Sequence, residues 1–333
     1  MGNQSQAQVS VSPEGEEFPL PTPEDYKKEN KRLAQLAAEH RAQGRQIVVV
    51  MGIGFVGAVM AAVVADSNNE KGEPGKFVIG MQRPSPRSYW KIPYLNRGQA
   101  PVKAEDPEVD LCISRCVLEK KTLVASFSYE ALTLADVVVV DVQCDYSKEA
   151  LADVTEGSVE MGALEASLKI IAEKIKPHCL VLIETTVPPG TTEYVAYPII
   201  KKAFRQRGIE EEPLLAHSFE RVMPGRDYVS SIRDFWRVCS GVNPASRAAV
   251  EQFLSQVLNV KDYPLTVLDR PIESETTKIV ENSFRATMLA FMDEWSRFAE
   301  RNGVDIVKVI NAIKRRPTHS NLMFPGPGIG GYC

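Results

Sequence analysis

Three glycines stand where a short apolar run meets the start of a helical pattern. Gly52, Gly54 and Gly57 form a G-x-G-x-x-G motif after IVVVM and before VGAVMAAVVA. In a strand–turn–helix context, such glycines allow a tight turn, close approach of the backbone to a pyrophosphate, and close helix–strand packing. The helix N-terminus would face the phosphates. We predict a dinucleotide site here, with Phe55 and Val56 beside it; a plain βα turn is the alternative.

The next apolar run, FVIGM, is followed by Gln82 and Arg83. At this position a carboxylate commonly accepts a hydrogen bond from the adenosine ribose, whereas a nearby arginine accommodates a 2′-phosphate. The carboxylate is missing in this chain. Because Gln82 can still bond a ribose hydroxyl, and Arg83 or Arg87 can neutralise a phosphate, the sequence predicts NAD and leaves NADP open.

Polar side chains also follow two later apolar runs. The segment ETTVPPGTT, residues 184–192, ends one run, and SFERVMPG, residues 218–225, follows the next. Since the carboxyl ends of parallel strands share the edge where ligands bind, Thr186, Glu220 and Arg221 are candidate contacts. A rigid surface turn explains the Pro-Pro-Gly segment equally well.

A lysine, an asparagine and a terminal cysteine complete the candidate groups. Lys278 and Asn282 are four residues apart in a helical pattern and share a face, which taken alone is typical of a solvated surface. Cys333 follows GIGG, where glycines let the backbone approach a ligand, and a thiolate beside a lysine is a nucleophile. The six cysteines include no CxxC pair, so we predict neither a metal site nor a disulfide scaffold.

The elements that position these groups follow an α/β pattern. Continuous apolar runs such as DVVVVDV indicate strands covered on both faces, which is typical of a parallel sheet wrapped by helices. We predict a Rossmann-like, doubly wound α/β fold. The predicted strands are Gln46–Gly54, Lys76–Met81, Thr122–Phe127, Ala135–Val142, Cys179–Thr185 and Pro213–Phe219.

The chain divides into four predicted regions. Residues 1–21 are polar and aperiodic and are predicted to be a disordered tail. Residues 22–44 form a helix with Thr22 as its cap, packed on its own domain rather than serving as a docking or dimerisation arm. Residues 45–270 form the dinucleotide-binding domain, and residues 271–333 form a central helical region that ends in a Gly/Pro-rich loop.

The helical region contains one long predicted helix, residues 272–300, and a second at about 305–315. Apolar residues recur along the long helix at three- and four-residue steps, which predicts a buried stripe. We expect this stripe to form a homodimer interface, with packing inside the chain as the alternative. Its members are Val280, Phe284, Met288, Phe291, Trp295 and Phe298.

Charge and composition exclude several classes of protein. Lysine and arginine total 39, aspartate and glutamate total 43, and the formal net charge is −4. The chain lacks the excess of basic residues that is typical of proteins that bind nucleic acids or membrane surfaces. The first residues lack a secretory signal, and no apolar run reaches the roughly 18 residues of a membrane span. We expect a cytoplasmic location.

In order, these segments resemble the UDP-glucose/GDP-mannose dehydrogenase family, the NAD-dependent nucleotide-sugar 6-dehydrogenases of polysaccharide biosynthesis. The resemblance runs from about Arg45 to Cys333. It rests on VVVMGIGFVG, LNRGQAPVKAE, LVLIETTVPPGTTE, FERVMPGR, the Lys278/Asn282 pair and GPGIGGYC. The resemblance therefore makes Lys278 and Asn282 a candidate catalytic pair, although their spacing alone is typical of a solvated surface.

The resemblance implies two hydride transfers from C6 of a UDP-sugar to NAD, through a thiohemiacetal and a thioester that water hydrolyses. By motif position, Cys333 would be the nucleophile, and Lys278 and Asn282 would stabilise the oxyanion. Thr186 would position water and contact the cofactor, and Glu220 would act as general base.

The substrate would contact Glu220, Arg221, Lys278 and Asn282. The segment ERVMPG is closer to the ERVLPG of UDP-N-acetylhexosamine enzymes than to the EFLREG-like segment of UDP-glucose enzymes. The resemblance also implies a homodimer through the central helical region.

Two departures from the family pattern affect these expectations. The sequence DVQCD, residues 141–145, replaces a Val-x-Thr-Pro pattern, and the sequence stops at Cys333, whereas family members continue into a second α/β domain that holds the substrate nucleotide. We therefore expect the N-terminal and central portion of such an enzyme, working with a separate C-terminal domain or subunit and binding NAD without turnover alone. The alternatives are a non-catalytic dinucleotide-binding protein and an ordinary hydroxyacid or 6-phosphogluconate-type dehydrogenase.

Overall fold

A computed structural model describes residues 8–147, 157–222 and 225–326. The chain forms two compact units, Met1–Glu275 and Thr276–Cys333, so the division falls five residues after the predicted start of the helical region. The predicted nucleophile, Cys333, and the glycines that precede it lie outside the described residues.

The first unit is built on an eight-stranded sheet in the order β12-β11-β10-β9-β6-β3-β4-β5. All neighbouring pairs are parallel except β10 with β11. The six predicted strands are confirmed, and β11 and β12 extend the sheet beyond them. The strands are β3 (Gln46–Met51), β4 (Lys76–Met81), β5 (Leu123–Ser126), β6 (Val137–Val140), β9 (Leu180–Ile183), β10 (Leu214–His217), β11 (Val238–Gly241) and β12 (Thr266–Val267).

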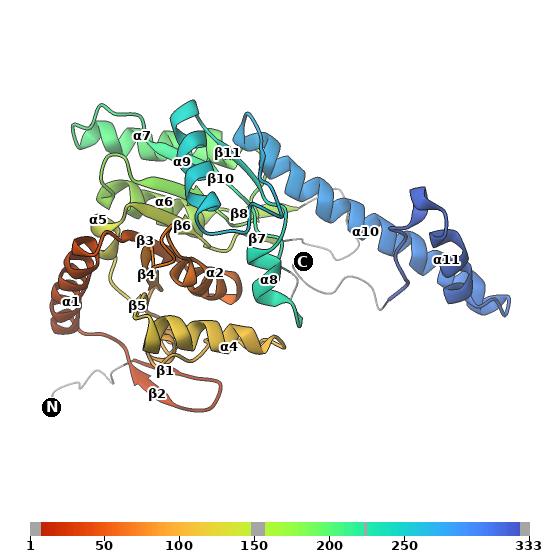
Figure 1. Ribbon diagram of the computed structural model, residues 1–333, viewed down its shortest axis with the longest axis horizontal. Helices are drawn as coiled ribbons and strands as arrows, with labels where there is room; N and C mark the ends of the chain where they lie inside the picture. Colours follow the sequence, from red (N-terminus) through yellow and green to blue (C-terminus); the bar gives the residue numbers. More distant parts are fainter. Residues whose placement is uncertain (1–7, 148–156, 223–224, 327–333) are drawn as a thin grey trace. The chain divides into compact units, whose positions relative to one another are not determined.

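Helices cover both faces of this sheet, which confirms the doubly wound fold (Figure 1). One apolar core lies under α2 (Phe55–Asp66), α3 (Lys91–Asn96), α4 (Pro107–Ser114), the π-helix η1 (Arg115–Glu119), α8 (Tyr228–Arg233) and α9 (Pro244–Ser255). The other lies under α1 (Pro23–Ala42), α5 (Ala131–Leu134), α6 (Gly162–Lys174), the π-helix η2 (Thr191–Ala196) and α7 (Tyr197–Gln206). A short hairpin of β7 (Asp145–Ser147) and β8 (Ser158–Glu160) stands apart from the sheet.

The prediction of a disordered tail is wrong for residues 8–21. They form a hairpin of β1 (Val9–Val11) and β2 (Glu17–Pro19) that packs on the segment around α3. The Trp90 backbone N–H donates to Ser10 Oγ at 3.1 Å, and Arg97 pairs with Glu16 at 2.8 Å. The Phe18 ring lies 6.0 Å from that of Tyr94. Partners from a distant segment order this hairpin, and no local pattern reveals them.

The helix predicted at residues 22–44 is confirmed as α1. Thr22 and Asp25 form a reciprocal capping box at its start, and Pro23 takes the first helical position. Leu33 and Ala37 are buried against the sheet, and the His40 ring stacks on Phe77 at 3.9 Å. The helix therefore lies on its own domain, as expected.

The second unit is helical. The chain enters it within α10 (Pro271–Arg301) and continues through α11 (Ile306–Lys314) and the short 3-10 helix η3 (Pro317–His319). Met288 packs in a small core with Met292, Ile310 and Leu322, so it departs from the predicted stripe. The other stripe residues are about half exposed: Val280, Phe284, Phe291, Trp295 and Phe298.

None of the helices formed by the described residues combines the length and the apolar character that crossing a bilayer requires.

Candidate functional site

The glycine turn connects β3 to α2 and has the geometry that the motif predicts. Gly52 adopts a φ of +103°, and a Cβ there would lie 2.6 Å from the carbonyl oxygen of Asp141. A Cβ on Gly57 would lie 1.9 Å from the carbonyl oxygen of Gly52. Nothing lies within 4 Å of a Cβ on Gly54. The first and third glycines therefore close the turn, and the second leaves space above it.

No side chain caps the N-terminus of α2. Gly54 occupies the N-cap position without a side-chain hydrogen bond, and the first turn carries no acidic residue. The first amide groups of a helix have no intrahelical acceptor, and the helix dipole favours an anion at this end. This turn is thus suited to a pyrophosphate.

The two residues that follow Gly54 differ in their surroundings. Phe55 is 40% exposed, and its ring lies 4.9 Å from that of buried Tyr228. The Tyr228 hydroxyl donates to the Phe55 carbonyl oxygen at 2.5 Å, which fixes the beginning of α2. Val56 is half buried and packs against the core. Of these two predicted cofactor contacts, Phe55 presents the more accessible surface.

The β4 strand ends level with β3, since Met51 and Met81 are partners in the sheet. Gln82, the next residue, accepts a hydrogen bond from the Ile53 backbone N–H at 3.2 Å. Its side chain therefore turns toward the glycine turn. Arg83 is exposed at the same strand end.

A buried carboxyl group that the sequence analysis did not single out lies beside the turn. Asp141 follows β6, and its side chain would lie 3.1 Å from a Cβ on Gly57. Its Oδ2 is buried and has no hydrogen-bond partner among the described residues. Burial, and then the charge of Glu220, raise the pKa of Asp141 to about 8, against the opposing charge of Arg237. The carboxyl is therefore mainly protonated at neutral pH.

Glu220 is buried after β10, and its Oε2 accepts from the Val222 backbone N–H at 2.5 Å. Its effect on Asp141 places it at the same edge as the glycine turn. The Arg221 guanidinium lies 5.6 Å from the Phe219 ring centre and 5.8 Å from that of Phe235. Aromatic faces hold this cation in place.

A buried ion pair lies near the carboxyl ends of the strands. Glu184, which ends β9, pairs with Arg237, and both are almost fully buried. The Arg237 Nε also donates to Ser218 Oγ at 3.3 Å. Burial lowers the pKa of Arg237 to about 10. Glu184 therefore faces into the protein, not the ligand crevice suggested by its place at a strand end.

The Pro-Pro-Gly turn directs the hydroxyls of Thr191 and Thr192 inward. Thr191 Oγ1 donates to the Pro188 carbonyl oxygen at 2.7 Å, and Thr192 Oγ1 donates to Glu275 Oε1 at 2.6 Å. The Gly190 amide also donates to Glu275 at 2.5 Å. These contacts anchor the turn to the start of α10. Thr186, which precedes it, is half buried.

Lys278 and Asn282 lie on α10 in the second unit, where Lys278 is buried and Asn282 is exposed. The helix that the sequence analysis assigned to them is confirmed. Their different burial shows that this face of α10 is not a uniform solvated surface.

Comparison with known proteins gives these features a context. Residues 46–257 match the NAD binding domain of the UDP-glucose/GDP-mannose dehydrogenase family, and residues 272–333 match its central domain. The chain belongs to this family. The sequence resemblance is thereby confirmed, and the glycine turn lies within the NAD binding domain. Residues 8–45, with the hairpin and α1, precede the matched region.

Similar proteins are nucleotide-sugar dehydrogenases. UDP-N-acetyl-D-mannosamine dehydrogenase of Pyrococcus horikoshii is 27% identical over 286 residues, covering 86% of this chain and 61% of the relative. NDP-N-acetyl-D-galactosaminuronic acid dehydrogenase of Ralstonia solanacearum is 27% identical over 296 residues, with 86% and 62% covered. This chain thus spans about 61% of the length of these relatives.

Solved structures agree with this assignment. NDP-N-acetyl-D-galactosaminuronic acid dehydrogenase from Methanosarcina mazei Go1 is 28% identical with a TM-score of 0.68, covering 90% of this chain and 60% of the other. UDP-D-ManNAc dehydrogenase from Pyrococcus horikoshii is 26% identical with a TM-score of 0.71, covering 86% and 62%.

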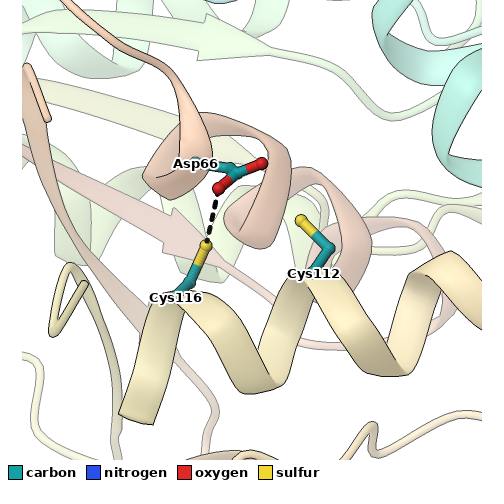
Figure 2. A group of neighbouring side chains, drawn as sticks. All are labelled: Asp66, Cys112 and Cys116. Carbon is teal, nitrogen blue, oxygen red and sulfur yellow. Dashed lines mark hydrogen bonds between the residues drawn. The ribbon is translucent and has the colours of Figure 1, made fainter. Parts of the chain in front are cut away.

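The structure also assembles a cluster that the cysteine spacing did not predict. Asp66, Cys112 and Cys116 place their ligand atoms within 4.8 Å of one another (Figure 2). The two cysteines are four residues apart on one continuous helical stretch, and this spacing was the available signal. The Cys116 thiol lies 3.8 Å from Asp66 Oδ1 and 3.5 Å from the Ala62 carbonyl oxygen.

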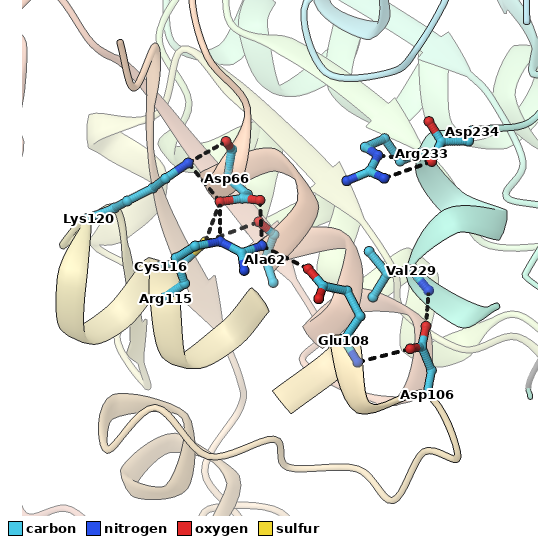
Figure 3. Close-up of polar contacts among 10 residues, drawn as sticks. All are labelled: Ala62, Asp66, Asp106, Glu108, Arg115, Cys116, Lys120, Val229, Arg233 and Asp234. Atoms are coloured by element: carbon cyan, nitrogen blue, oxygen red, sulfur yellow. Dashed lines mark hydrogen bonds and ion pairs between the residues drawn. The ribbon is translucent and has the colours of Figure 1, made fainter. Parts of the chain in front are cut away.

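The contacts around this cluster do not favour a metal ion. Arg115 forms a bidentate pair with Asp66 at 2.8 and 3.1 Å, and Lys120 approaches it at 2.7 Å (Figure 3). Although burial opposes it, hydrogen bonds from Arg115 and Lys120 lower the pKa of Asp66 to about 2. The neighbouring Cys112 and then burial raise the pKa of Cys116. The carboxylate is already neutralised by cations, and the raised pKa of Cys116 opposes the thiolate that a metal needs.

A cavity of about 1320 Å³ lies at the opposite edge of the sheet from the glycine turn. The first residues of five strands line it, including Lys76, whose pKa burial lowers to about 8. The Lys76 ammonium donates to Gln256 Oε1 at 2.8 Å. Ligands of such sheets bind at the carboxyl ends of the strands, so this cavity is not the dinucleotide site.

Proposed function

We propose that this chain binds a nicotinamide dinucleotide at the β3–α2 turn and acts in the oxidation of a nucleotide sugar at C6. The observation that carries the proposal is the turn itself. Gly52 and Gly57 exclude any side chain, Gly54 opens onto free space, and α2 starts without a capping side chain. The family assignment supports hydride transfer as the chemistry.

The catalytic roles follow the family motifs. Bound NAD would accept a hydride from C6 in each of two oxidations. The Cys333 thiolate would add to the aldehyde from the first oxidation, forming a C–S bond, and water would later release the carboxylate from the thioester. Lys278 and Asn282 would donate hydrogen bonds to the developing oxyanion. Glu220 would take the proton from the attacking water, which Thr186 would help to position.

The substrate we propose is a UDP-N-acetylhexosamine, with contacts from Glu220, Arg221, Lys278 and Asn282. The names of the relatives support an N-acetylated sugar, since they include UDP-N-acetyl-D-mannosamine and NDP-N-acetyl-D-galactosaminuronic acid dehydrogenases. The ERVMPG segment of this chain supports the same class. We place this chemistry in the cytoplasm, where nucleotide sugars and reduced thiols coexist.

We also propose that the chain forms a homodimer through the stripe on α10. Five large apolar side chains there are about half exposed, and Trp295 contacts Phe298 with ring centres 5.5 Å apart. An apolar stripe of this length marks an interface. Trp295→Glu should shift the mass measured by light scattering from dimer to monomer, whereas Trp236→Glu, at a comparably exposed tryptophan of the first unit, should not. A monomeric wild-type chain at micromolar concentration would contradict this proposal.

Binding of NADH tests the proposed cofactor site. Gly54→Val fills the open space above the turn and should weaken binding at least about tenfold, because the side chain occupies the pyrophosphate position. Gly162→Val is the matched control, since Gly162 begins α6 with nothing within 4 Å of its Cβ position. Equal affinity in wild-type and Gly54→Val chains would refute the assignment.

A further inference from the structure

The end of β4 lacks the acidic group that selects an unphosphorylated ribose. A carboxylate at this point accepts the 2′-hydroxyl of NAD and repels the 2′-phosphate of NADP. Gln82 takes its place, and its Oε1 is occupied by the Ile53 backbone N–H at 3.2 Å. The strand end therefore presents no negative charge from this position.

Two exposed arginines lie in the turn that follows β4. Arg83 and Arg87 are both exposed, and neither forms an ion pair within the part of the chain that the structure describes. Burial raises the pKa of Tyr129, and the nearby charge of Arg83 opposes this rise. Tyr129 follows β5, the neighbour of β4 in the sheet. Arg83 is thus on the side of the sheet edge away from β3, where the adenosine half of a dinucleotide lies.

A compact turn holds these arginines close to the strand end. Ser88 Oγ donates to the Arg83 carbonyl oxygen at 3.0 Å and lies 2.7 Å from Ser85 Oγ. Two prolines, at positions 84 and 86, restrict the backbone between the arginines. Ordering the turn before the ligand arrives reduces the entropy lost on binding.

The N-terminal segment braces this turn. The Trp90 backbone N–H donates to Ser10 Oγ in the hairpin, and Trp90 Nε1 donates to the Arg87 carbonyl oxygen at 3.2 Å. The nearby carboxylates of α1 are engaged elsewhere: Asp25 accepts from Thr22 at 2.7 and 2.8 Å, and Glu29 pairs with Arg32. The hairpin half of this brace, which supplies Ser10, lies outside the residues that match the family's NAD binding domain.

We propose that Arg83 and Arg87 form a subsite for the adenosine 2′-phosphate, so that this chain binds NADP more tightly than NAD. This inference rests on the proposed function, because it needs a dinucleotide at the glycine turn. Guanidinium groups bind phosphate oxygens through paired, charge-assisted hydrogen bonds. NAD carries no group to receive them, and Gln82 imposes no penalty on the phosphate.

Equilibrium titration with NADH and NADPH, followed by nicotinamide fluorescence, tests the subsite. In the wild-type chain NADPH should bind about tenfold more tightly than NADH, and 2′,5′-ADP should displace it better than 5′-ADP does. Arg83→Ala should remove most of this preference with about twofold or less effect on NADH. Gln82→Asp should reverse the preference. Arg205→Ala, at an exposed arginine of α7, is the control and should change neither affinity.

The outcomes separate the subsite from the proposed function. Tighter binding of NADH by the wild-type chain, or equal loss of both ligands in Arg83→Ala, would overturn the subsite and leave the dinucleotide site standing. Binding of neither ligand would overturn both the proposed function and the subsite.

Discussion

Two carboxyl groups, one beside each end of α2, have pKa values shifted in opposite directions. At its C-terminal end, Asp66 is held by Arg115 and Lys120, and hydrogen bonds with them lower its pKa to about 2 despite burial. At its N-terminal end, burial and the charge of Glu220 raise the pKa of Asp141 to about 8, and Asp141 Oδ2 has no partner among the described residues. One end of the helix is internally satisfied, and the other is not.

This difference indicates that the Asp66 end of α2 serves packing, whereas the Asp141 end is suited to a ligand. The Asp66 end joins α2 to α4 and η1 through ion pairs, and Asp106 extends the connection by accepting from the Val229 backbone N–H at 2.9 Å (Figure 3). The Asp141 end keeps one carboxyl oxygen, Oδ2, without a hydrogen-bond partner among the described residues, beside the glycine turn. Buried groups that lack partners and have shifted pKa values are typical of sites where a ligand completes the contacts.

The largest expected effect on stability comes from adding a side chain at Gly57, beside the N-terminal end of α2. Gly57→Ala puts a Cβ 1.9 Å from the Gly52 carbonyl oxygen, so the turn must shift. We expect a loss of about 4 kcal/mol in the free energy of unfolding, measured by urea denaturation. Gly54→Ala, which enters open space, should cost about 1 kcal/mol or less. Similar losses for the two variants would show that the turn is not closed by Gly57.

The next effect concerns Asp141. Its pKa is higher in the folded chain, so the folded state binds more protons between about pH 4 and pH 8, and stability falls as pH rises through that range. Asp141→Asn cannot ionise and should be more stable than wild type by about 3 kcal/mol at pH 8, because it removes a charge that burial and Glu220 disfavour. At pH 4 the two should be alike. Parallel stability profiles across this range would contradict an uncompensated carboxyl.

Asp66 should show the opposite dependence. Its pKa is lower in the folded chain, so its contribution is present above about pH 4 and is lost as pH falls toward 2. Asp66→Asn should cost about 2 kcal/mol at pH 7 and leave NADH affinity unchanged. Thermal unfolding of both chains at pH 7 and near pH 2 measures this loss of stability. A change in NADH affinity would mean that the two ends of α2 are coupled.

The smallest effect is expected at the thiols beside Asp66. Cys112→Ala should cost about 1 kcal/mol. Added Zn²⁺ should not raise the melting temperature of the wild-type chain, because the raised pKa of Cys116 opposes a thiolate and Asp66 is already paired. Stabilisation by Zn²⁺ that disappears in Cys112→Ala would reveal a metal site at this end instead.

The sequence predicts most of the fold because buried parallel strands leave continuous apolar runs. Those of β3, β4 and β6 are examples. It misses β11 because VCSG is short and not uniformly apolar, and it misses the N-terminal hairpin because long-range contacts such as Trp90–Ser10 order it.

The glycines of the site are predictable because backbone geometry demands them at a fixed spacing. Asp141 is not, because its condition depends on Glu220 and Arg237, which are distant in the sequence. The inward threonines of the Pro-Pro-Gly turn depend in the same way on Glu275. Cys112 and Cys116 carry a local signal, their spacing of four, but Asp66 joins them only through the tertiary fold.

A crystal structure of the chain with a reduced nicotinamide dinucleotide tests the central claim most directly. We predict the pyrophosphate over Gly54, accepting hydrogen bonds from the first amide groups of α2, with the adenosine ribose beside Gln82. The Asp66 end of α2 should be unchanged. A dinucleotide seated instead in the cavity lined by Lys76 at the opposite edge of the sheet, with the glycine turn empty, would contradict the account.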